Sequence, residues 1–181
     1  SVVKEPIVCK RKMAYVPDTP RLEEYMTGMQ YLNFVCDIYQ ISAKERKQNI
    51  ERLIHAFQME PHISGLISSY SHGMKQKVAL IAAFSHNPKL LVLDEPFVGL
   101  DPEAFIALKE QMKMLCRKGS SILFSSHILD VVEKLCNIIS IIKDGRLLYS
   151  GLTEELIGVE GLEDAFMELN SNESFDPSIE K

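Results

Sequence analysis

The chain has 181 residues, of which 46% are hydrophobic and 25% are charged. These values are usual for a globular domain and unlike those of a disordered or collagen-like chain. Its 20 Lys and Arg residues and 25 Asp and Glu residues give a net charge of −5, which disfavours a nucleic-acid binder with a broad basic face, because phosphate binding needs clustered positive charge. No uncharged run reaches the roughly 18 residues of a membrane span.

The four cysteines are scattered along the chain, without any C-x-x-C pair. A zinc site or a disulfide framework would need closer, paired spacing. We therefore expect four reduced thiols, buried or half-buried, in a protein of a reducing compartment.

The first half of the chain is predicted to be short strands followed by helices. Residues 1–16 read as short strands, and Pro17 and Pro20 then exclude a regular element. Capping-box patterns begin at Thr27 and Ser42, each with a Gln or Glu three residues later. Apolar residues recur after the second cap at helical spacing, at Ile50, Leu53, Ile54 and Phe57. The stretch up to about residue 85 is therefore expected to be helical.

Further along, apolar strands alternate with helices. Residues 90–93 are a continuous apolar run, and Asp101 followed by proline is typical of a helix start. Residues 121–126 and 138–142 are further apolar strands, and residues 143–146 are a hairpin turn. This alternation predicts a parallel sheet sandwiched by helices. The expected fold is an α/β core interrupted by a helical lobe.

Two of the predicted strands end in candidate catalytic side chains. Asp94 and Glu95 follow the first apolar strand, at the carboxyl edge where open parallel sheets bind ligands. Two neighbouring carboxylates are costly to bury unless a cation compensates, which points to Mg²⁺ with phosphates. Solvated acids in a strand-end turn are the alternative. His127 follows the next strand and converges on the same edge, although a capping or buried histidine is the default for an isolated imidazole.

A second candidate region precedes a helix that is apolar all round. Ser71 is an expected N-cap, Gly73 permits close approach, and Lys75 and Lys77 stand in the first turns. Lysines there oppose the helix dipole, so an anionic partner would offset the conflict. The other reading is an exposed start of a core helix, and the residues alone leave both open.

Together these segments resemble the nucleotide-binding domain of ABC ATPases. Residues 90–96 resemble the Walker B strand with its catalytic glutamate, and residues 99–101 resemble the D-loop. Residues 71–76 are similar to the ABC signature, residues 15–18 lie where the Q-loop falls, and His127 corresponds to the switch histidine. The resemblance runs over nearly the whole chain, and its motifs occur in the family's order and spacing.

The sequence departs from the family pattern at several places. His72 and Met74 replace a Gly and a Gln of the signature, a variant similar to that of bacterial export-type ABC ATPases. Asp18 stands where Gln is usual. No G-x-x-x-x-G-K-S/T sequence is present, so the phosphate-binding loop, or Walker A motif, is missing. Since the chain also begins with Ser1, we expect it to be the C-terminal portion of an ABC domain.

The resemblance implies a P-loop NTPase-like α/β fold that lacks its N-terminal strand, phosphate loop and helix. Residues 1–20 would be the end of the N-terminal strand region and the Q-loop, and residues 21–88 the helical subdomain with the signature. Residues 89–169 would be the ATPase core with the Walker B, D-loop and switch histidine segments. Residues 170–181 would be a loose tail.

The resemblance also implies a set of roles in ATP hydrolysis with Mg²⁺. Glu95 and His127 would be catalytic, Asp94 would hold the metal, and Asp18 would be a second contact to metal and nucleotide. In a head-to-tail dimer, Ser71 and Gly73 would reach the γ-phosphate of the nucleotide bound to the other subunit. Asp101 would couple the two sites.

The implied protein is an ATPase subunit that powers export through separate transmembrane permease subunits. It would be cytoplasmic, on the inner face of the membrane, with no span of its own and no nucleic-acid partner. Without the phosphate loop, this chain alone is expected to be inactive. The alternatives are a soluble, non-transport ABC ATPase associated with ribosomes or DNA, and an inert regulatory fragment.

Overall fold

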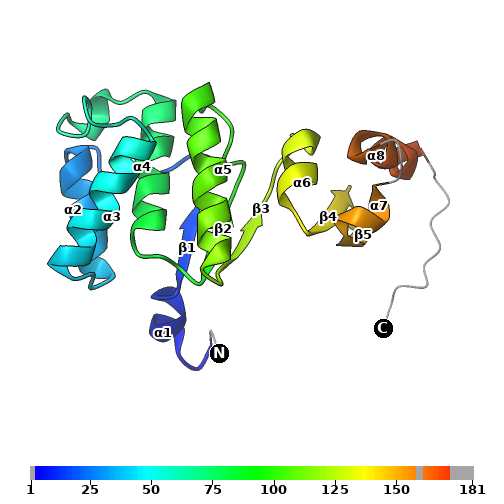
Figure 1. Ribbon diagram of the computed structural model, residues 1–181, viewed down its shortest axis with the longest axis horizontal. Coiled ribbons are helices and arrows are strands. Elements are labelled where there is room, and N and C mark those ends of the chain that lie inside the picture. The colour runs from blue at the N-terminus through cyan, green and yellow to red at the C-terminus, as the bar shows by residue number, and fades with distance from the viewer. Residues whose placement is uncertain (1–2, 158–160, 172–181) are drawn as a thin grey trace. The chain divides into compact units, whose positions relative to one another are not determined.

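The computed structural model describes residues 3–157 and 161–171 (Figure 1). The chain divides into two compact units, Ser1–Ser125 and Ser126–Lys181, which we describe separately. The domain boundaries expected from the sequence remain predictions, and the expected loose tail lies outside the described residues from 172 onward.

The core of the first unit is a three-stranded parallel sheet, as expected. Its strands β1 (Met13–Val16), β2 (Leu90–Leu93) and β3 (Ser121–Phe124) lie in the order β1-β2-β3. Helices α4 (His72–Ser85) and α5 (Pro102–Arg117) contact β1 and β3 and lie in front of the sheet in Figure 1. One face of the strands is buried, at Ala14, Val16, Leu91 and Leu93.

Within the first unit the other face of this sheet is open, whereas the sequence predicted helices on both faces. The register aligns Tyr15 with Val92 and Val92 with Leu123, so that the three side chains form one row. Tyr15 is 63% exposed and Leu123 is 64% exposed. Parallel sheets are normally covered on both faces, yet within the described residues of the first unit helices cover only one.

The helical lobe contains α2 (Gly28–Ile38), α3 (Ala43–Ala56) and the short 3-10 helix η1 (Ile67–Ser69), followed by α4. The capping box at Thr27 is confirmed, with both hydrogen bonds to Gln30 formed. Ser42 also caps its helix, but its hydroxyl donates to the Glu45 carboxylate in place of the reciprocal backbone bond. The apolar stripe of α3 is buried as predicted, at Ile50, Leu53, Ile54 and Phe57.

Helix α4 is the centre of the first unit, because α2, α3, α5 and β1 all contact it. Its residues from Gln76 to Ser85 are buried. This burial on all sides explains why the sequence shows no polar face along this helix.

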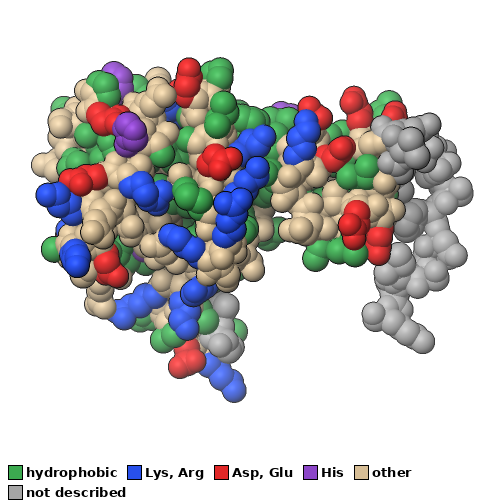
Figure 2. Space-filling view, in the orientation of Figure 1, with side chains coloured by type: hydrophobic (Ala, Val, Ile, Leu, Met, Phe, Trp, Pro, Cys, Tyr) green, Lys and Arg blue, Asp and Glu red, His purple; other side chains and the backbone are tan. Residues whose placement is uncertain are grey.

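Helix α5 has a buried and a charged side. It begins at the Asp101 cap with Pro102 in its first turn, as predicted. Its buried stripe consists of Ala104, Leu108, Met112 and Leu115. On the outer side Lys109, Lys113 and Arg117 recur at one-turn spacing, and Figure 2 shows Lys and Arg side chains along this helix. Glu110 lies 4.0 Å from Lys113, so the outer charges are of both signs.

The start of the chain differs from the prediction of short strands. Residues Pro6–Lys10 form the helix α1, and β1 begins only at Met13. Proline lacks the N–H that a strand ladder uses, whereas its fixed φ suits the first turn of a helix. Pro6 occupies this first turn in α1, which explains the difference.

The second unit contains α6 (Leu129–Leu135), β4 (Ile138–Lys143), β5 (Arg146–Leu152), α7 (Thr153–Leu156) and α8 (Leu162–Ser171). The predicted hairpin is confirmed, with Asp144 and Gly145 at positive φ in its turn. Strand β4 pairs with β5 in a separate antiparallel sheet, where the sequence favoured a further parallel strand.

All four cysteines are free thiols, as expected. Cys36 is buried and Cys9 and Cys136 are half-buried, but Cys116 is exposed, contrary to the prediction of burial. No helix in the described parts of the chain is long and apolar enough to cross a membrane.

Candidate functional site

The two adjacent carboxylates stand at the carboxyl end of β2, where the sequence placed them. Asp94 follows Leu93 directly, and its N–H donates to the carbonyl oxygen of Val16 at 2.9 Å. This bond continues the pairing of β2 with β1 by one residue. Asp94 and Glu95 are both half-buried. The pairing of β2 with β1 therefore fixes the backbone at Asp94, directly before Glu95.

Ser125 ties these two residues to the neighbouring strand. Because Leu93 pairs with Phe124, Ser125 lies opposite Asp94 across the sheet edge. Its hydroxyl donates to Asp94 Oδ1 at 2.6 Å and accepts the backbone N–H of Glu95 at 2.9 Å. The sequence analysis missed this residue. The available signal was its position at the end of the strand next to the acidic pair.

Glu95 has an uncommon backbone conformation, with a φ of 43°. Non-glycine residues in this left-handed region are held there by their surroundings and often belong to functional sites. The Ser125 bond to the Glu95 N–H restrains it on one side. Beyond it, Val98 donates its N–H to the Glu95 carbonyl oxygen, and Phe97 packs against Phe105. The sharp turn after β2 is therefore fixed at both ends.

The second candidate region begins at the N-cap of α4. Ser71 accepts the N–H of Met74 at 3.2 Å, and Ser71 and His72 are exposed. A Cβ atom on Gly73 would lie 2.6 Å from the carbonyl oxygen of Gly99. Gly99 itself has a φ of 74°, and the ring of His72 is packed against it. Residues 71–76 and 99–101, separate in the sequence, are thus in direct backbone contact.

Both lysines at the start of α4 are paired with carboxylates of this chain. Lys75 Nζ lies 2.5 Å from Glu24, and Lys77 Nζ lies 2.5 Å from Asp101 Oδ2. Of the two readings that the sequence left open, the structure shows anionic partners, and these are carboxylates of the same chain. Asp101 Oδ1 accepts the N–H of Ala104 at 2.8 Å. The hydrogen bond from Lys77 is the main cause that lowers the pKa of Asp101.

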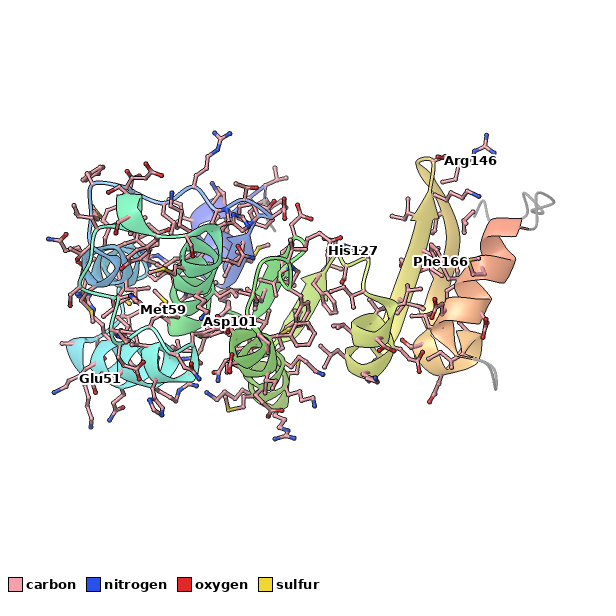
Figure 3. All side chains as sticks on the ribbon, turned by 90° about the horizontal axis from the view of Figure 1, so that it is seen from above. Glu51, Met59, Asp101, His127, Arg146 and Phe166 are labelled. Atoms are coloured by element: carbon pink, nitrogen blue, oxygen red, sulfur yellow. The ribbon has the colours of Figure 1, made fainter. Side chains whose placement is uncertain are left out.

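Asp18 and His127 are the two remaining residues predicted for the site. Asp18 is exposed two residues beyond β1, where it accepts a hydrogen bond from the Thr19 hydroxyl at 3.4 Å. His127 is an exposed residue at the start of the second unit, just before α6. Figure 3 labels Asp101 in the first unit and His127 in the second. A position for His127 opposite Glu95 remains a prediction.

The polar side chains of the sheet edge fit a magnesium ion that arrives with a nucleotide. Across the described residues, no group of three or more His, Cys, Asp and Glu side chains is placed to hold a metal ion. Mg²⁺ commonly binds through one or two carboxylates, with water and substrate phosphates as its other ligands. Asp94, oriented by Ser125, would supply such a carboxylate.

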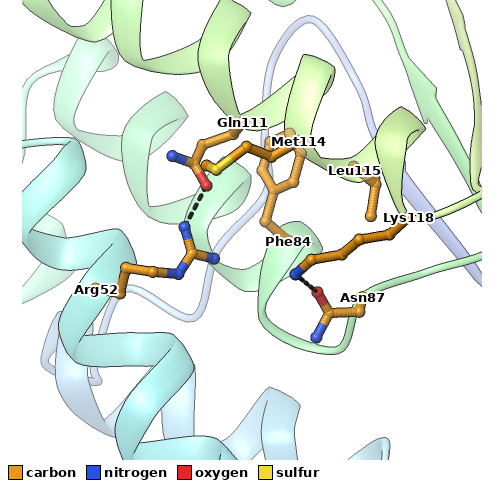
Figure 4. A pocket seen from close by; sticks show the side chains of 7 residues that line it. All are labelled: Arg52, Phe84, Asn87, Gln111, Met114, Leu115 and Lys118. Carbon is orange, nitrogen blue, oxygen red and sulfur yellow. Dashed lines mark hydrogen bonds between the residues drawn. The ribbon is translucent and has the colours of Figure 1, made fainter.

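A small pocket lies on another side of the first unit, between α3, α5 and the end of α4 (Figure 4). Its lining consists of Arg52, Phe84, Asn87, Gln111, Met114, Leu115 and Lys118. Arg52 donates to Gln111 at 2.5 Å, and Lys118 donates to Asn87 at 3.4 Å. None of the residues predicted for the site lines this pocket. The pocket is therefore a gap between packed helices and not part of the candidate site.

Comparisons with known proteins agree with the motifs. The model of the family described as ABC transporter matches residues 4–98. The ABC-type transporter ATP-binding protein EcsA of Bacillus subtilis is 34% identical over 165 residues, which are 91% of this chain and 67% of EcsA. The ABC transporter ATP-binding protein NatA of the same organism is 33% identical over 163 residues, 90% of this chain and 66% of NatA.

The fold has a close counterpart among solved structures. A structure of the ATP binding subunit of an ABC transporter matches with a TM-score of 0.88 and 34% identity, over 93% of this chain and 72% of that one. The chain spans about two thirds of the length of EcsA and NatA, and 45% of a further relative from Nostoc.

Proposed function

Because this chain belongs to the ABC transporter ATP-binding proteins, a family of ATPases, we propose that it carries the hydrolytic residues of an ATP-driven motor for export. The observation that carries this proposal is the pair Asp94 and Glu95 at the end of β2, tied to Ser125. The carboxyl edge of a parallel sheet is where such folds bind their ligands.

Each residue of the sheet edge has a role in the proposed reaction. Glu95 orients and deprotonates the water that attacks the γ-phosphate of ATP. Asp94 holds Mg²⁺ through its water shell, with Asp18 as a second contact, and His127 donates a hydrogen bond to the γ-phosphate. The bound Mg²⁺ neutralises charge that develops on the phosphate oxygens. Ser125 keeps the Asp94 carboxylate and the Glu95 backbone in register.

The start of α4 serves the nucleotide held by a second subunit in a head-to-tail dimer. Ser71 and Gly73 contact its γ-phosphate, where the N–H groups and the dipole of the 14-residue helix favour an anion. Asp101 couples the two nucleotide sites. The contact between Gly73 and Gly99 supports this role, because it joins the segment beside Asp101 to the start of α4.

The phosphates of ATP need a further element. The 181 residues contain no G-x-x-x-x-G-K-S/T sequence, and we propose that polypeptide outside them supplies this loop. The open face of the sheet supports this, since Tyr15 and Leu123 are exposed where a covering layer is normal. Lys75 and Lys77 are not substitutes for the loop lysine, because Glu24 and Asp101 already neutralise them. The isolated chain is expected to be inactive.

The proposed task of hydrolysis is to drive separate permease subunits. These would dock beside Asp18 and the helical lobe, and the proposed location of the protein is the cytoplasmic face of the membrane. The sequence Ser71-His72-Gly73-Met74 supports export over import, because this variant is similar to that of bacterial export-type ABC ATPases. A pull-down from membranes that depends on a co-expressed permease tests this assignment, and capture without any permease would contradict it.

The hydrolytic proposal is tested by Glu95→Gln in a longer polypeptide that includes the phosphate loop. The substitution keeps the size of the side chain but removes the base, so turnover is expected to fall by a factor on the order of 10² while ATP binding persists. Glu103→Gln is the matched control, because Glu103 is an exposed residue of the first turn of α5. Turnover of Glu95→Gln near the wild-type rate would exclude the proposed mechanism.

A further inference from the structure

Two independent contacts join the start of α4 to residues 99–101, which we call the D-loop. The first is the backbone contact of Gly73 with the Gly99 carbonyl oxygen, where even one Cβ atom would be 2.6 Å away. The second is the ion pair of Lys77 with Asp101 at 2.5 Å. They lie about one turn of α4 apart, so they fix both the position and the direction of the D-loop against this helix.

We propose that Lys77 is a positioning residue that fastens the D-loop to α4, so that both segments act on the nucleotides as one rigid piece. The attachment of the D-loop to α4 through these two contacts, which we call the joint, is a property of this chain. Only its consequence for hydrolysis rests on the proposed ATPase function. The segment that resembles the signature ends at residue 76, so the resemblance assigns no role to Lys77. A lysine in the second turn of a helix is usually a solvated side chain.

The burial of Lys77 makes this ion pair different from a surface pair. The Lys77 side chain is 11% exposed, against 45% for Lys113 on α5. Its partner Asp101 is 44% exposed, so the ammonium group is the buried member of the pair. A buried ammonium group without a partner is costly, so Asp101 is a required partner for it. Exposed pairs, by contrast, contribute little because water and salt screen them.

Asp101 is held by both of its carboxylate oxygens. Oδ2 is paired with Lys77, and Oδ1 accepts the N–H of Ala104 in the first turn of α5. This single carboxylate therefore links three segments: α4, the D-loop and α5. Phe97, just before the D-loop, is 4% exposed and packs against Phe105 and Phe124 of the core. A shift of α4 must then be transmitted to the turn that contains Glu95.

Lys75, the other lysine at the start of α4, is attached to the helical lobe and not to the D-loop. Lys75 is paired with Glu24, which precedes α2 in the helical lobe. The start of α4 thus has one lysine fixed to the lobe and one fixed to the D-loop. Loss of the Lys77 pair is expected to leave the lobe attached while the D-loop loosens. The result would be a slower chemical step with little change in ATP affinity, because the attacking geometry is disturbed and the phosphate contacts are not.

The first test measures the joint in the 181-residue chain without nucleotide. Hydrogen exchange of the Leu100 and Ala104 amides is compared in the wild type, Lys77→Met and Lys113→Met. The joint predicts that Lys77→Met raises exchange at these amides at least about fivefold relative to core amides of β2, as expected for local opening. Lys113→Met is expected to leave it unchanged. Equal exchange in wild type and Lys77→Met would overturn the proposal.

Asp101→Asn provides a second variant in case Lys77→Met does not fold. Asparagine is as good an N-cap as aspartate, so the bond to Ala104 is kept while the charge on which Lys77 depends is removed. Faster exchange at Leu100 in this variant supports the joint, and unchanged exchange contradicts it. Lys77→Arg keeps the charge and is expected to retain protection.

The second test uses the longer polypeptide with its phosphate loop. Lys77→Met is expected to lower kcat about tenfold with KM for ATP within about twofold, and Lys77→Arg is expected to restore most of the rate. An unchanged kcat would overturn the positioning role. If the wild type itself does not hydrolyse ATP, the proposed function fails, and the exchange measurement alone then decides whether the joint exists.

Discussion

The carboxyl edge of the sheet and the start of α4 are both rich in polar groups, but they use them differently. At the sheet edge, Ser125 orients Asp94 and restrains Glu95 through two hydrogen bonds, and the carboxylates stay at the rim of the fold. At the start of α4, Lys75 and Lys77 are neutralised by carboxylates of the same chain. We propose that the first arrangement presents charge to a ligand, whereas in the second the ion pairs hold segments of the chain together.

We expect this contrast to separate the residues that act on phosphate from the residues that position them. Charged groups at a helix start suggest an anion site, and the N–H groups of α4 remain suited to one. The lysines beside them serve packing, however, since their partners are Glu24 and Asp101. Substitutions in the two regions should therefore change different quantities, and the following three predictions are ordered by the size of the expected effect.

The largest effect is expected for Gly73→Ala, which breaks the joint at its tightest contact. The new Cβ atom would lie 2.6 Å from a backbone oxygen, which cannot rotate away, so Gly99 must shift. We expect a loss of about 1–3 kcal/mol in the free energy of unfolding and a fall in turnover on the order of 10². Denaturant unfolding and ATPase rates measure these two quantities.

Gly119→Ala is the control for Gly73→Ala. Gly119 has a φ of 82°, and nothing lies within 4 Å of its Cβ position. It therefore reports the backbone cost of an alanine at positive φ, about 1–2 kcal/mol, without a clash. Its turnover, corrected for the folded fraction, should equal that of the wild type. If Gly73→Ala behaves in the same way, the two segments are not in tight contact.

An intermediate effect is expected for Ser125→Ala, which tests the sheet edge. The variant loses the donor to Asp94 and the acceptor for the Glu95 N–H. We expect about a tenfold lower turnover and a loss of about 1 kcal/mol in stability. The concentration of Mg²⁺ needed for half-maximal rate should rise, because the carboxylate that holds the ion is no longer oriented.

Two variants make the Ser125 prediction specific. Ser125→Thr keeps the hydroxyl and should recover most of the activity. Ser126→Ala removes the neighbouring hydroxyl, which accepts the N–H of Ile128 in the second unit, and should leave the Mg²⁺ dependence unchanged. A rise in the Mg²⁺ requirement in Ser126→Ala as large as in Ser125→Ala would show that Ser125 has no special role.

The smallest effect concerns pH and lies outside both regions, at His86 after α4. Its ring stacks on Tyr39 with centroids 3.7 Å apart, and burial lowers its pKa below 6.5. Because the folded state disfavours the protonated ring, the stability that His86 contributes is complete above pH 6.5. It is lost as the pH falls through the folded pKa. His86→Gln should therefore flatten the stability profile below pH 6.5.

Much of the fold followed from local patterns in the sequence. The caps at Thr27 and Asp101 and the apolar stripe of α3 are confirmed, because each depends on residues within one or two helical turns. The position of Asp94 and Glu95 followed from the apolar run before them, since the half-buried strand β2 ends where these charged residues begin. The prediction of short strands at the start of the chain was wrong, because Pro6 occupies the first turn of a helix, α1, in a stretch whose sequence reads as strand.

The partners of the site residues could not be predicted, because they depend on tertiary contacts. Glu24 lies 51 residues before Lys75, and nothing in either segment marks the two as a pair. Ser125 and Ser126 look alike in sequence, yet only the register of β3 against β2 brings the first hydroxyl to Asp94. The contact of Gly73 with Gly99 likewise requires α4 and the turn after β2 to be packed together.

The proposed difference between the sheet edge, which acts on phosphate, and the start of α4, whose lysines position other segments, is tested most directly by a single-turnover comparison. The comparison uses Glu95→Gln and Lys77→Met in the longer polypeptide. We expect both variants to bind ATP like the wild type. Hydrolysis should be lowered by a factor on the order of 10² in Glu95→Gln and about tenfold in Lys77→Met. Hydrolysis by Glu95→Gln near the wild-type rate would contradict the assignment of the sheet edge as the catalytic region.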